Sequence, residues 1–363
     1  MTPIRALLVY AAGADNATLS YQTGWPRHFM AHPAFDCTPV NLSEPGWAAR
    51  IRRTLAVRRA TNDLVIMLHS VFSNTPVMSR RMFETIRDLP QPKAFFIGNE
   101  YKLMPEKMQF CEDIGVALLV TQSLHPAVHD EYRKRLGCAV VGLPNTGLDT
   151  ELFRPRTPRA ERPIDLGYRA LPGVPYLGHT EREDIAEYFQ ENALRLGLVV
   201  DISLAPQKRF AEPEWAAFLN QCKGQLGTEA GGDVFELTDA TRLAVNSYLA
   251  EHPAASMDDI RSRFFDERTT RTPMRILSGR NVEAAGTRTV QMLFEGRYDG
   301  YFEPDVHYIP LKKDFSNVDE AIGKFRDCAY AERLAGNAYD LVTSEFTYDR
   351  LLTRFRDSVA PLL

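Results

Sequence analysis

The chain has 363 residues, of which 44 % are hydrophobic and 25 % charged; this is the balance of an ordinary globular protein and excludes a disordered or fibrous chain. One hydrophobic core stops growing at roughly 250 to 300 residues, so the length predicts two domains. The net charge is −4, from 43 Lys and Arg against 47 Asp and Glu, which argues against non-specific electrostatic binding of nucleic acid or anionic lipid. Any phosphate-binding site must therefore be local.

The apolar runs and the cysteines indicate the compartment. No apolar run approaches the ~20 residues that cross a bilayer, and the stretch MTPIRALLVYAAG at the start is too short in its apolar part for a signal peptide. The cysteines are odd in number and lack a CxxC spacing, which favours a reducing compartment and no structural zinc. We therefore expect a cytoplasmic protein without a transmembrane segment. The cysteines are Cys37, Cys111, Cys138, Cys222 and Cys328.

Strand-like and helix-like segments alternate through the first 150 residues. Segments 45–61 and 79–88 carry apolar residues at helical spacing, and we interpret the arginines among them as a solvated face. Short apolar runs between such helices are typical of buried strands, so the alternation predicts βαβ units around a parallel sheet. These runs lie at 6–10, 64–68, 94–97, 117–121 and 139–142.

The sequence pattern changes at 144–158, which contains three prolines and no regular spacing of apolar residues. This change predicts a domain boundary. A second alternating series follows, with strands expected at 164–168 and 198–203 and helices at 181–196 and 213–223. The economical interpretation is a second α/β domain.

Helical segments fill much of the remaining chain. Residues 239–268 form two helical pieces split by His252-Pro253, which we interpret as an insertion. Residues 319–328 and 329–359 again have helical character.

Loops that follow predicted strands are the first place to search for a site, because α/β proteins bind ligands outside the carboxyl ends of their strands. His69 follows strand 64–68, where its imidazole would face the cleft between the domains; a hydrogen-bonded strand-end histidine is the alternative. Gly231 and Gly232 lie in GTEAGGD, where backbone N–H groups could approach an anion, although a glycine pair also makes a simple turn.

Two further groups are candidates for donor contacts. The segment 288–300, which begins at Arg288, predicts a helix with Gln291 and Glu295 on one face; a solvated surface glutamate is the alternative. Basic residues also follow the strands of the second domain and could converge on one diphosphate, with surface salt bridges as the alternative. These are Arg169, after strand 164–168, and Lys208 with Arg209, after strand 198–203.

The segment LPNTGLDTELFRP at 143–155 resembles the inter-domain passage of nucleotide-sugar glycosyltransferases with two Rossmann-like domains, the GT-B type, written P-N-G-V-D-x-x-x-F-x-P. Thr146 intervenes before the glycine, and Leu148 replaces the valine. From about 286 to 355 the chain also resembles the terminal domain of family 4-like, spore-maturation-protein-like glycosyltransferases. There, a glutamate before a small-residue turn is followed by a strand, an acidic loop and two helices.

The resemblance implies two Rossmann-like α/β/α domains that face a central cleft. Residues 1–150 would be the acceptor-side domain, and 151–335 the nucleotide-sugar donor domain with its insertion at 239–268. Residues 336–363 would be a C-terminal helix that returns toward the N-terminal domain.

The resemblance also implies roles for single residues. The family has two glutamates in the second domain, the later one holding the donor ribose, and we carry them over to Glu229 and Glu295. The family spaces them closely, whereas here the insertion lies between them. The residues so implied at the reacting centre are His69, Arg169, Lys208 and Glu229, and those around the donor are Arg209, Gly231, Gly232, Arg288, Gln291 and Glu295.

On the acceptor side, the loop 11–25 follows the first strand, and its aromatic residues could stack on a sugar ring or simply pack in the core. A second loop follows strand 94–97. The acceptor-side candidates are Gly13, Tyr21, Trp25, Asn99 and Glu100.

The sequence as a whole predicts a glycosyltransferase that moves a sugar from a nucleoside-diphosphate donor to a glycan, a lipid-linked sugar or a small molecule, with retention. Such transfer requires fixed cations and N–H groups that stabilise the leaving diphosphate. No Asp-x-Asp triplet occurs, so we expect no metal and no other cofactor. A nucleotide-sugar 2-epimerase and a non-catalytic nucleotide-sugar-binding or assembly module remain alternatives.

Overall fold

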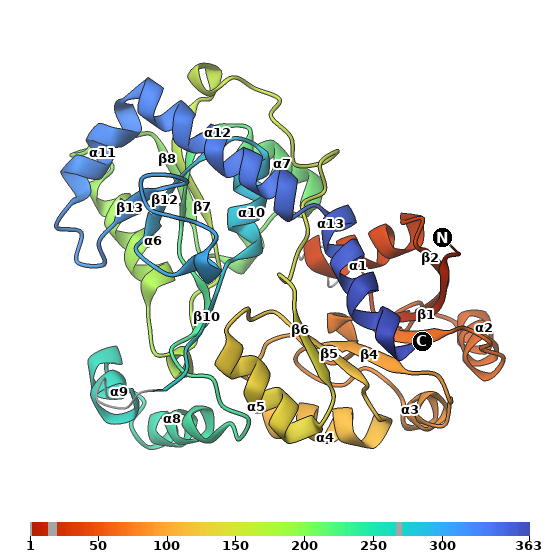
Figure 1. Cartoon of the computed structure of the whole chain (residues 1–363). Helices are drawn as coiled ribbons and strands as arrows, with labels where there is room; N and C mark the ends of the chain where they lie inside the picture. The colour runs from red at the N-terminus through yellow and green to blue at the C-terminus, as the bar shows by residue number, and fades with distance from the viewer. Residues whose placement is uncertain (1, 14–19, 266–270) are drawn as a thin grey trace. The chain divides into compact units, whose positions relative to one another are not determined.

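The computed structural model describes residues 2–13, 20–265 and 271–363, which form two compact α/β units (Figure 1). Unit 1 combines Met1–Gly147 with Phe235–Asp239 and Tyr348–Leu363, and unit 2 combines Leu148–Val234 with Ala240–Thr347. The chain thus enters unit 2 at residue 148, three residues before the expected position 151, and its C-terminal part returns to unit 1 at residue 348 rather than at 336.

Unit 1 is built on a six-stranded parallel sheet in the order β2-β1-β3-β4-β5-β6. The three strands β3, β4 and β5 are buried along their whole length, as expected of strands covered by helices on both faces. The strands are β1 (Ile4–Tyr10), β2 (Phe35–Asn41), β3 (Leu64–Met67), β4 (Lys93–Phe96), β5 (Leu118–Thr121) and β6 (Ala139–Gly142).

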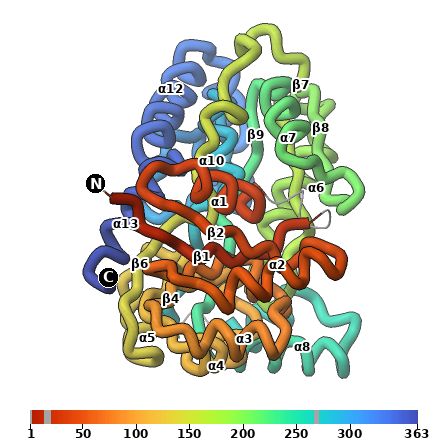
Figure 2. The backbone as a smooth tube through the Cα atoms, turned by 90° about the vertical axis from the view of Figure 1, so that its right-hand side faces the viewer, coloured from red at the N-terminus to blue at the C-terminus, as the bar shows by residue number. Residues whose placement is uncertain are grey.

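Helices alternate with these strands along the chain (Figures 1 and 2). They are α1 (Ser20–Ala31), α2 (Trp47–Arg58), α3 (Arg80–Arg87), α4 (Met104–Ile114), α5 (Pro126–Leu136) and the C-terminal α13 (Tyr348–Val359). The expectation of βαβ units is therefore confirmed.

The C-terminal helix α13 packs into the core of unit 1, as the resemblance implied. Tyr348, its first residue, stacks on His28 with ring centroids 4.1 Å apart, and its hydroxyl lies 3.2 Å from Thr146 Oγ1. A Cβ at Gly24 would lie 2.1 Å from that hydroxyl, and a Cβ at Gly147 would lie 2.7 Å from the same ring. Both glycines are therefore needed for this close packing.

Unit 2 contains a five-stranded parallel sheet in the order β13-β12-β9-β7-β8 and a two-stranded antiparallel ribbon, β10-β11. The sheet strands are β7 (Ile164–Arg169), β8 (Val200–Ser203), β9 (Cys222–Gly227), β12 (Val290–Phe294) and β13 (Ile309–Leu311), and the ribbon strands are β10 (Ala230–Gly232) and β11 (Met274–Ile276). The helices are α6 (Glu181–Asn192), α7 (Glu212–Leu219), α8 (Ala240–Glu251), α9 (Met257–Phe264), α10 (Gly279–Gly286), α11 (Val318–Arg326) and α12 (Cys328–Glu345).

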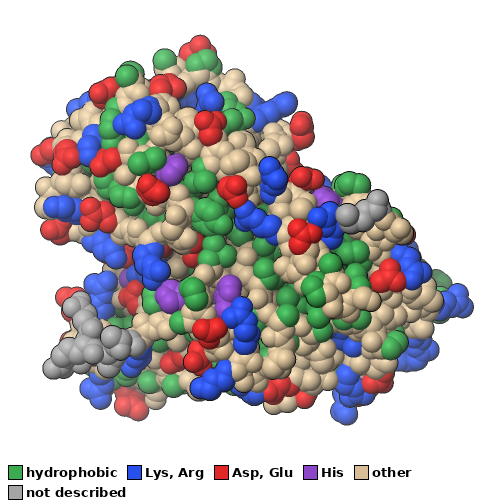
Figure 3. Space-filling view, viewed as in Figure 1, with side chains coloured by type: hydrophobic (Ala, Val, Ile, Leu, Met, Phe, Trp, Pro, Cys, Tyr) green, Lys and Arg blue, Asp and Glu red, His purple; other side chains and the backbone are tan. Residues whose placement is uncertain are grey.

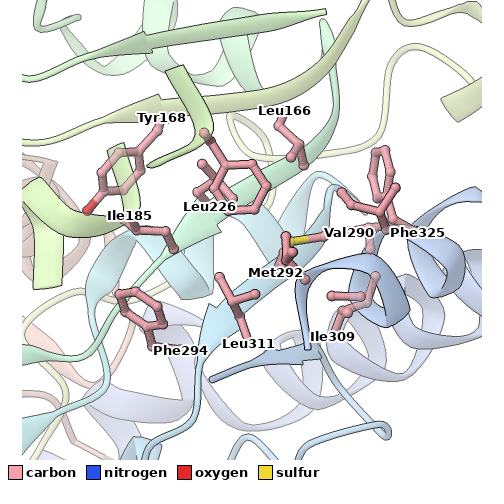
Figure 4. Packing of buried hydrophobic residues seen from close by; sticks show 14 of the residues in the cluster. Leu166, Tyr168, Ile185, Leu226, Val290, Met292, Phe294, Ile309, Leu311 and Phe325 are labelled. Carbon is pink, nitrogen blue, oxygen red and sulfur yellow. The ribbon is translucent and has the colours of Figure 1, made fainter. Parts of the chain in front are cut away.

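The core of unit 2 lies between its sheet and the covering helices. Figure 4 shows Leu166, Leu226 and Met292, from three adjacent strands, packed together with Ile185 of α6 and Phe325 of α11. All five side chains are buried. Parallel strands of this kind end at one common edge, which places the loops after β7, β8, β9 and β12 side by side.

The segment 288–300 corrects one prediction. Residues Val290–Phe294 form strand β12, which lies between β13 and β9 and is buried at every position, instead of the expected helix. A continuous apolar run fits a buried strand as well as a buried helix, and this run is only five residues long.

The predicted insertion is helical. Its two pieces are α8 and α9, and Ser256 caps α9 in a capping box with Asp259: the Ser256 Oγ accepts the Asp259 N–H at 3.1 Å, and the Asp259 carboxylate accepts the Ser256 N–H at 2.9 Å. Residues 266–268, the end of the predicted segment, lie outside the described residues. No helix in the described part of the chain is long and apolar enough to span a membrane.

Candidate functional site

Three arginines lie together at the carboxyl edge of the unit 2 sheet. Arg182 is in the first turn of α6, which follows β7, and Arg280 is in the first turn of α10, which leads into β12. Arg209 follows the short helical turn Pro206–Lys208 after β8. The positive charges of Arg209 and Arg182 both act on Arg280, so each of the two lies near Arg280. We call these three residues the arginine cluster.

Arg280 is the most constrained member of the cluster. Its guanidinium carbon lies 5.2 Å from the ring centre of Trp215, and its Nη1 is buried without a hydrogen-bond partner. Burial, followed by repulsion from Arg209, lowers the pKa of Arg280 to about 10. A buried donor of a charged group that lacks a partner is costly, which points to an anion as the missing partner.

Tyr168 and Thr228 complete the surroundings of the cluster. Burial raises the pKa of Tyr168 to about 12, and the nearby Arg182 and Arg280 oppose that rise. Thr228 directly follows β9, and its hydroxyl donates to the carbonyl of Glu229 at 3.0 Å. Tyr168 is therefore buried close to the guanidinium groups of Arg182 and Arg280.

Glu283 is a functional candidate that the sequence reasoning missed. It lies one turn after Arg280, is 3 % exposed, and its Oε2 accepts the Trp215 indole N–H at 2.7 Å. It is followed by the small residues Ala284–Gly286, then β12, a loop with acidic residues, and the helices α11 and α12. Glu283, rather than Glu295, thus occupies the place of the glutamate in the resemblance, and the signal was the run S-G-R-N-V-E-A-A-G.

The neighbouring strand and α7 hold the Arg169 side chain in place. Its guanidinium donates to the Asp201 carbonyl at 2.8 Å and to the Asp201 carboxylate at 2.7 Å, and it lies 4.5 Å from the ring centre of Phe218. Asp201 belongs to the neighbouring strand β8. Arg169 therefore ties β7 to β8 and packs on α7, and its predicted contact with a diphosphate stays a prediction. Lys208, by contrast, is exposed.

The glycine pair serves the antiparallel ribbon. Gly231 has φ +86°, and a Cβ there would lie 1.7 Å from the carbonyl oxygen of Met274 in the facing strand. A Cβ at Gly232 would lie 3.1 Å from Leu177. The need for glycine at Gly231 and Gly232 is thus explained by close strand pairing and packing, and the predicted approach of an anion to their N–H groups stays a prediction.

The three candidates of the segment 288–300 are dispersed. Arg288 precedes the amino end of β12 and stacks on Tyr339 of α12 at 4.6 Å, so it lies at the opposite edge from the cluster. Gln291 is buried in β12 and accepts the Asn281 amide at 2.9 Å. Glu295 directly follows β12 and is exposed.

Glu229 anchors the loop that follows β12. Its Oε1 accepts the backbone N–H of Tyr298 at 2.7 Å and that of Arg297 at 3.1 Å. Burial raises the pKa of Glu229, and these hydrogen bonds oppose the rise. Tyr298 and Asp299 have positive φ values of 44° and 55°, so the carboxylate holds a strained turn in place.

A buried ionic network supports the same region. Arg275 of β11 pairs with Glu181 at 2.9 Å and with Asp233 at 2.6 Å, and Lys313 reaches Glu181 at 2.7 Å. The attraction of Arg275 holds the pKa of Glu181 below its usual value against the opposing effect of burial, so Glu181 stays charged. These pairs fix the start of α6, and with it Arg182.

In unit 1, His69 lies in a short helical turn directly after β3 and is 2 % exposed. The rings of Tyr21 and Phe96 surround it with centroids 5.6 Å and 5.3 Å away. Burial lowers the pKa of His69 to about 3, so the imidazole is neutral near pH 7. A neutral ring can accept or donate a hydrogen bond, but it supplies no positive charge.

The other acceptor-side candidates are mostly structural. Trp25 is fully buried, and its indole N–H donates to the Asn145 carbonyl at 2.8 Å, so of the two roles left open by the sequence it has the one in core packing. Tyr21 is half-buried against His69. Gly13 is exposed, and the loop 11–25 that contains it includes 14–19, which lie outside the described residues.

Glu100 is 1 % exposed and is also structural. Its carboxylate accepts the Tyr132 hydroxyl at 2.6 Å and the Gln122 N–H at 2.8 Å, which leaves no accessible oxygen for an acceptor. Asn99 adopts a left-handed conformation with φ 48° and donates to Ser73 Oγ at 3.0 Å. This pair shapes the loop after β4.

Within the described residues, no group of three or more His, Cys, Asp and Glu side chains is arranged to hold a metal ion. The expectation of a metal-independent reaction stays a prediction.

Comparison with solved structures identifies the fold. HepE from Anabaena, in complex with UDP-glucose, aligns with a TM-score of 0.54 and 10 % identity over 99 % of this chain and 100 % of its own. Sucrose-phosphate synthase from Thermosynechococcus elongatus aligns with a TM-score of 0.54 and 11 % identity over 99 % of each chain. This is the GT-B fold. No protein-family model and no curated sequence matches the chain.

Proposed function

We propose that this protein transfers a sugar from a nucleoside-diphosphate donor to an acceptor, and that the arginine cluster of unit 2 binds the donor's diphosphate. The observation that carries the proposal is the buried Nη1 of Arg280, which lacks a partner beside the further positive charges of Arg209 and Arg182. HepE, which has the same fold, binds UDP-glucose, so uridine diphosphate is the first nucleotide to test.

The chemistry of glycosyl transfer suits this cluster. Departure of the diphosphate develops negative charge on its oxygens, and guanidinium groups that are already in place stabilise that charge. The N-termini of α6 and α10 lie at the same edge and add their positive dipole ends. Because these cations can perform the task of a divalent ion, we also propose that the reaction needs no metal.

Glu283 and Glu229 would act on the donor in different ways. In the glycosyltransferases that the sequence resembles, a glutamate holds the donor ribose. We assign this role to Glu283, because it is a buried carboxylate one turn from Arg280. Glu229 would be a positioning residue that holds the loop after β12. Retention of the sugar's stereochemistry is likewise part of the proposal.

His69 would act on the acceptor side as a neutral imidazole. The acceptor would be a glycan, a lipid-linked sugar or a small molecule. All five cysteines are free thiols, which supports a cytoplasmic location.

The test has two stages. Thermal-shift measurements against the diphosphates of uridine, guanosine, thymidine, adenosine and cytidine identify the nucleotide, since a ligand that binds only the folded state raises the melting temperature. The corresponding sugar donors are then assayed for release of the diphosphate. Release confirms turnover, a change of sugar stereochemistry without acceptor indicates the epimerase alternative, and binding without release indicates a non-catalytic module.

A further inference from the structure

The helix α2 of unit 1 exposes an apolar stripe. Trp47 is 78 %, Ile51 50 % and Leu55 42 % exposed, and their spacing of four residues puts them on one side of the helix. The opposite side, with Ala49 and Val57, is buried against unit 1. The outward face therefore carries large apolar side chains, which an ordinary surface helix turns toward the core.

Arginines accompany this stripe. The segment WAARIRRTLAVRR at 47–59 contains five arginines and no acidic residue. Arg53 donates to the carbonyl groups of Asn41 and Glu44, and Arg52 pairs with the Glu44 carboxylate.

The remaining arginines, Arg50, Arg58 and Arg59, are exposed and form no ion pair among the described residues. At about 100° per residue, Arg58 falls within the apolar stripe, and Arg59 and Arg50 flank it on either side. In Figure 1 α2 lies at the right-hand edge of unit 1, and Figure 3, in the same view, shows basic side chains gathered along that edge. Figure 2 shows this side facing the reader.

An anionic bilayer surface has the chemistry that complements this face. Tryptophan favours the boundary between headgroups and acyl chains, and aliphatic side chains enter that boundary from a helix lying in its plane. Arginines reach outward to anionic headgroups while their stems stay with the apolar stripe. The net charge of −4 does not oppose this contact, because electrostatic attraction falls off within a Debye length of about 10 Å.

We propose that α2 docks unit 1 on an anionic membrane surface, with Trp47, Ile51 and Leu55 inserted at the headgroup level and the unpaired arginines on lipid headgroups. The solvated face that the arginines indicate in the sequence is then also a lipid-binding face. The proposal does not depend on the reaction in unit 2, since it concerns binding alone.

The test is cosedimentation of the full chain with vesicles of phosphatidylcholine alone and with 30 % phosphatidylglycerol. Wild type should bind the anionic vesicles, weakly or not at all the neutral ones, and less at 0.5 M salt. Each unpaired arginine should contribute about fivefold, so the triple change R50S/R58S/R59S should weaken binding on the order of a hundredfold. The apolar change W47S/I51S/L55S should weaken it at least tenfold.

Matched controls keep the test specific. The change L194S/V199S alters side chains of unit 2 that are 95 % and 59 % exposed, and it should leave vesicle binding unchanged. Circular dichroism confirms that each variant is folded, which is expected because the altered side chains are exposed. The proposal would be overturned if wild type did not bind vesicles, or if it bound both vesicle types equally. It would also be overturned if wild type were a dimer that the change W47S/I51S/L55S converts to a monomer.

Discussion

Arg280 should increase nucleotide affinity at the expense of the stability of the ligand-free protein. An unperturbed guanidinium has a pKa of about 12.5 or higher, and one pKa unit corresponds to about 1.4 kcal/mol. Since burial and the neighbouring arginines lower the pKa of Arg280 to about 10, its charged form is disfavoured in the fold by about 3 kcal/mol. Below pH 10 the side chain is charged in both folded and unfolded states, so this cost is present at neutral pH.

The substitution Arg280→Met keeps the length of the side chain and removes the charge. It also removes the contact with Trp215, which is worth about 1 kcal/mol. The free energy of unfolding without ligand should therefore rise by about 2 kcal/mol, or roughly 4 to 8 °C in melting temperature. Loss of a hydrogen bond to a charged group should weaken nucleoside-diphosphate binding by about 1.5 to 3 kcal/mol, or roughly 10- to 150-fold.

Calorimetric titration and urea unfolding measure the two quantities on the same variant. Arg288→Met is the matched control, because Arg288 stacks on Tyr339 at the opposite edge of the sheet and should change nucleotide affinity by less than about twofold. Unchanged affinity in Arg280→Met, combined with a loss of stability, would show that Arg280 is a structural residue and would refute the reasoning.

Three further substitutions test other parts of the structure. His69→Leu should make the free energy of unfolding less dependent on pH in the acid range. In the unfolded chain the histidine binds a proton below pH 6.5, whereas in the folded protein it does so only near its pKa of about 3. Urea unfolding should therefore show that wild type loses about 2 kcal/mol more stability than the variant between pH 7 and pH 5. Gly231→Ala should cost about 3 kcal/mol or more, because its Cβ would meet the Met274 carbonyl at 1.7 Å; an unchanged melting temperature would disprove the close ribbon packing. Glu100→Leu should destabilise unit 1 by about 3 to 5 kcal/mol while nucleotide affinity stays the same, and a selective loss of affinity would contradict its structural role.

The architecture follows from the sequence where strands are buried on both faces. The runs 64–68 and 94–97 contain no polar interruption long enough to suggest another structure, and each corresponds to an interior strand. The strand β2 gives a weaker signal. It carries Asp36 and Pro39 and pairs with β1 alone, at the edge of the sheet, where a missing N–H is tolerated.

The site was harder to predict because side-chain direction depends on neighbours that are distant in sequence. Arg169 lies at a strand end as expected, but its guanidinium is bound to Asp201 in the adjacent strand, a contact that the sequence does not show. The prediction of a helix at 288–300 also made Glu295 the candidate glutamate, although Glu295 is exposed. The helix α10, which carries Arg280 and Glu283, was not predicted as part of the site. Of the basic residues proposed for the diphosphate from sequence, Arg209 is the one that the structure brings to Arg280.

A crystal structure with the nucleoside diphosphate bound would test the central claim most directly. The account predicts phosphate oxygens within about 3 Å of Arg280 Nη1, with Arg209 or Arg182 on the same diphosphate. A diphosphate bound elsewhere, with the Nη1 of Arg280 still buried and without a partner, would contradict it.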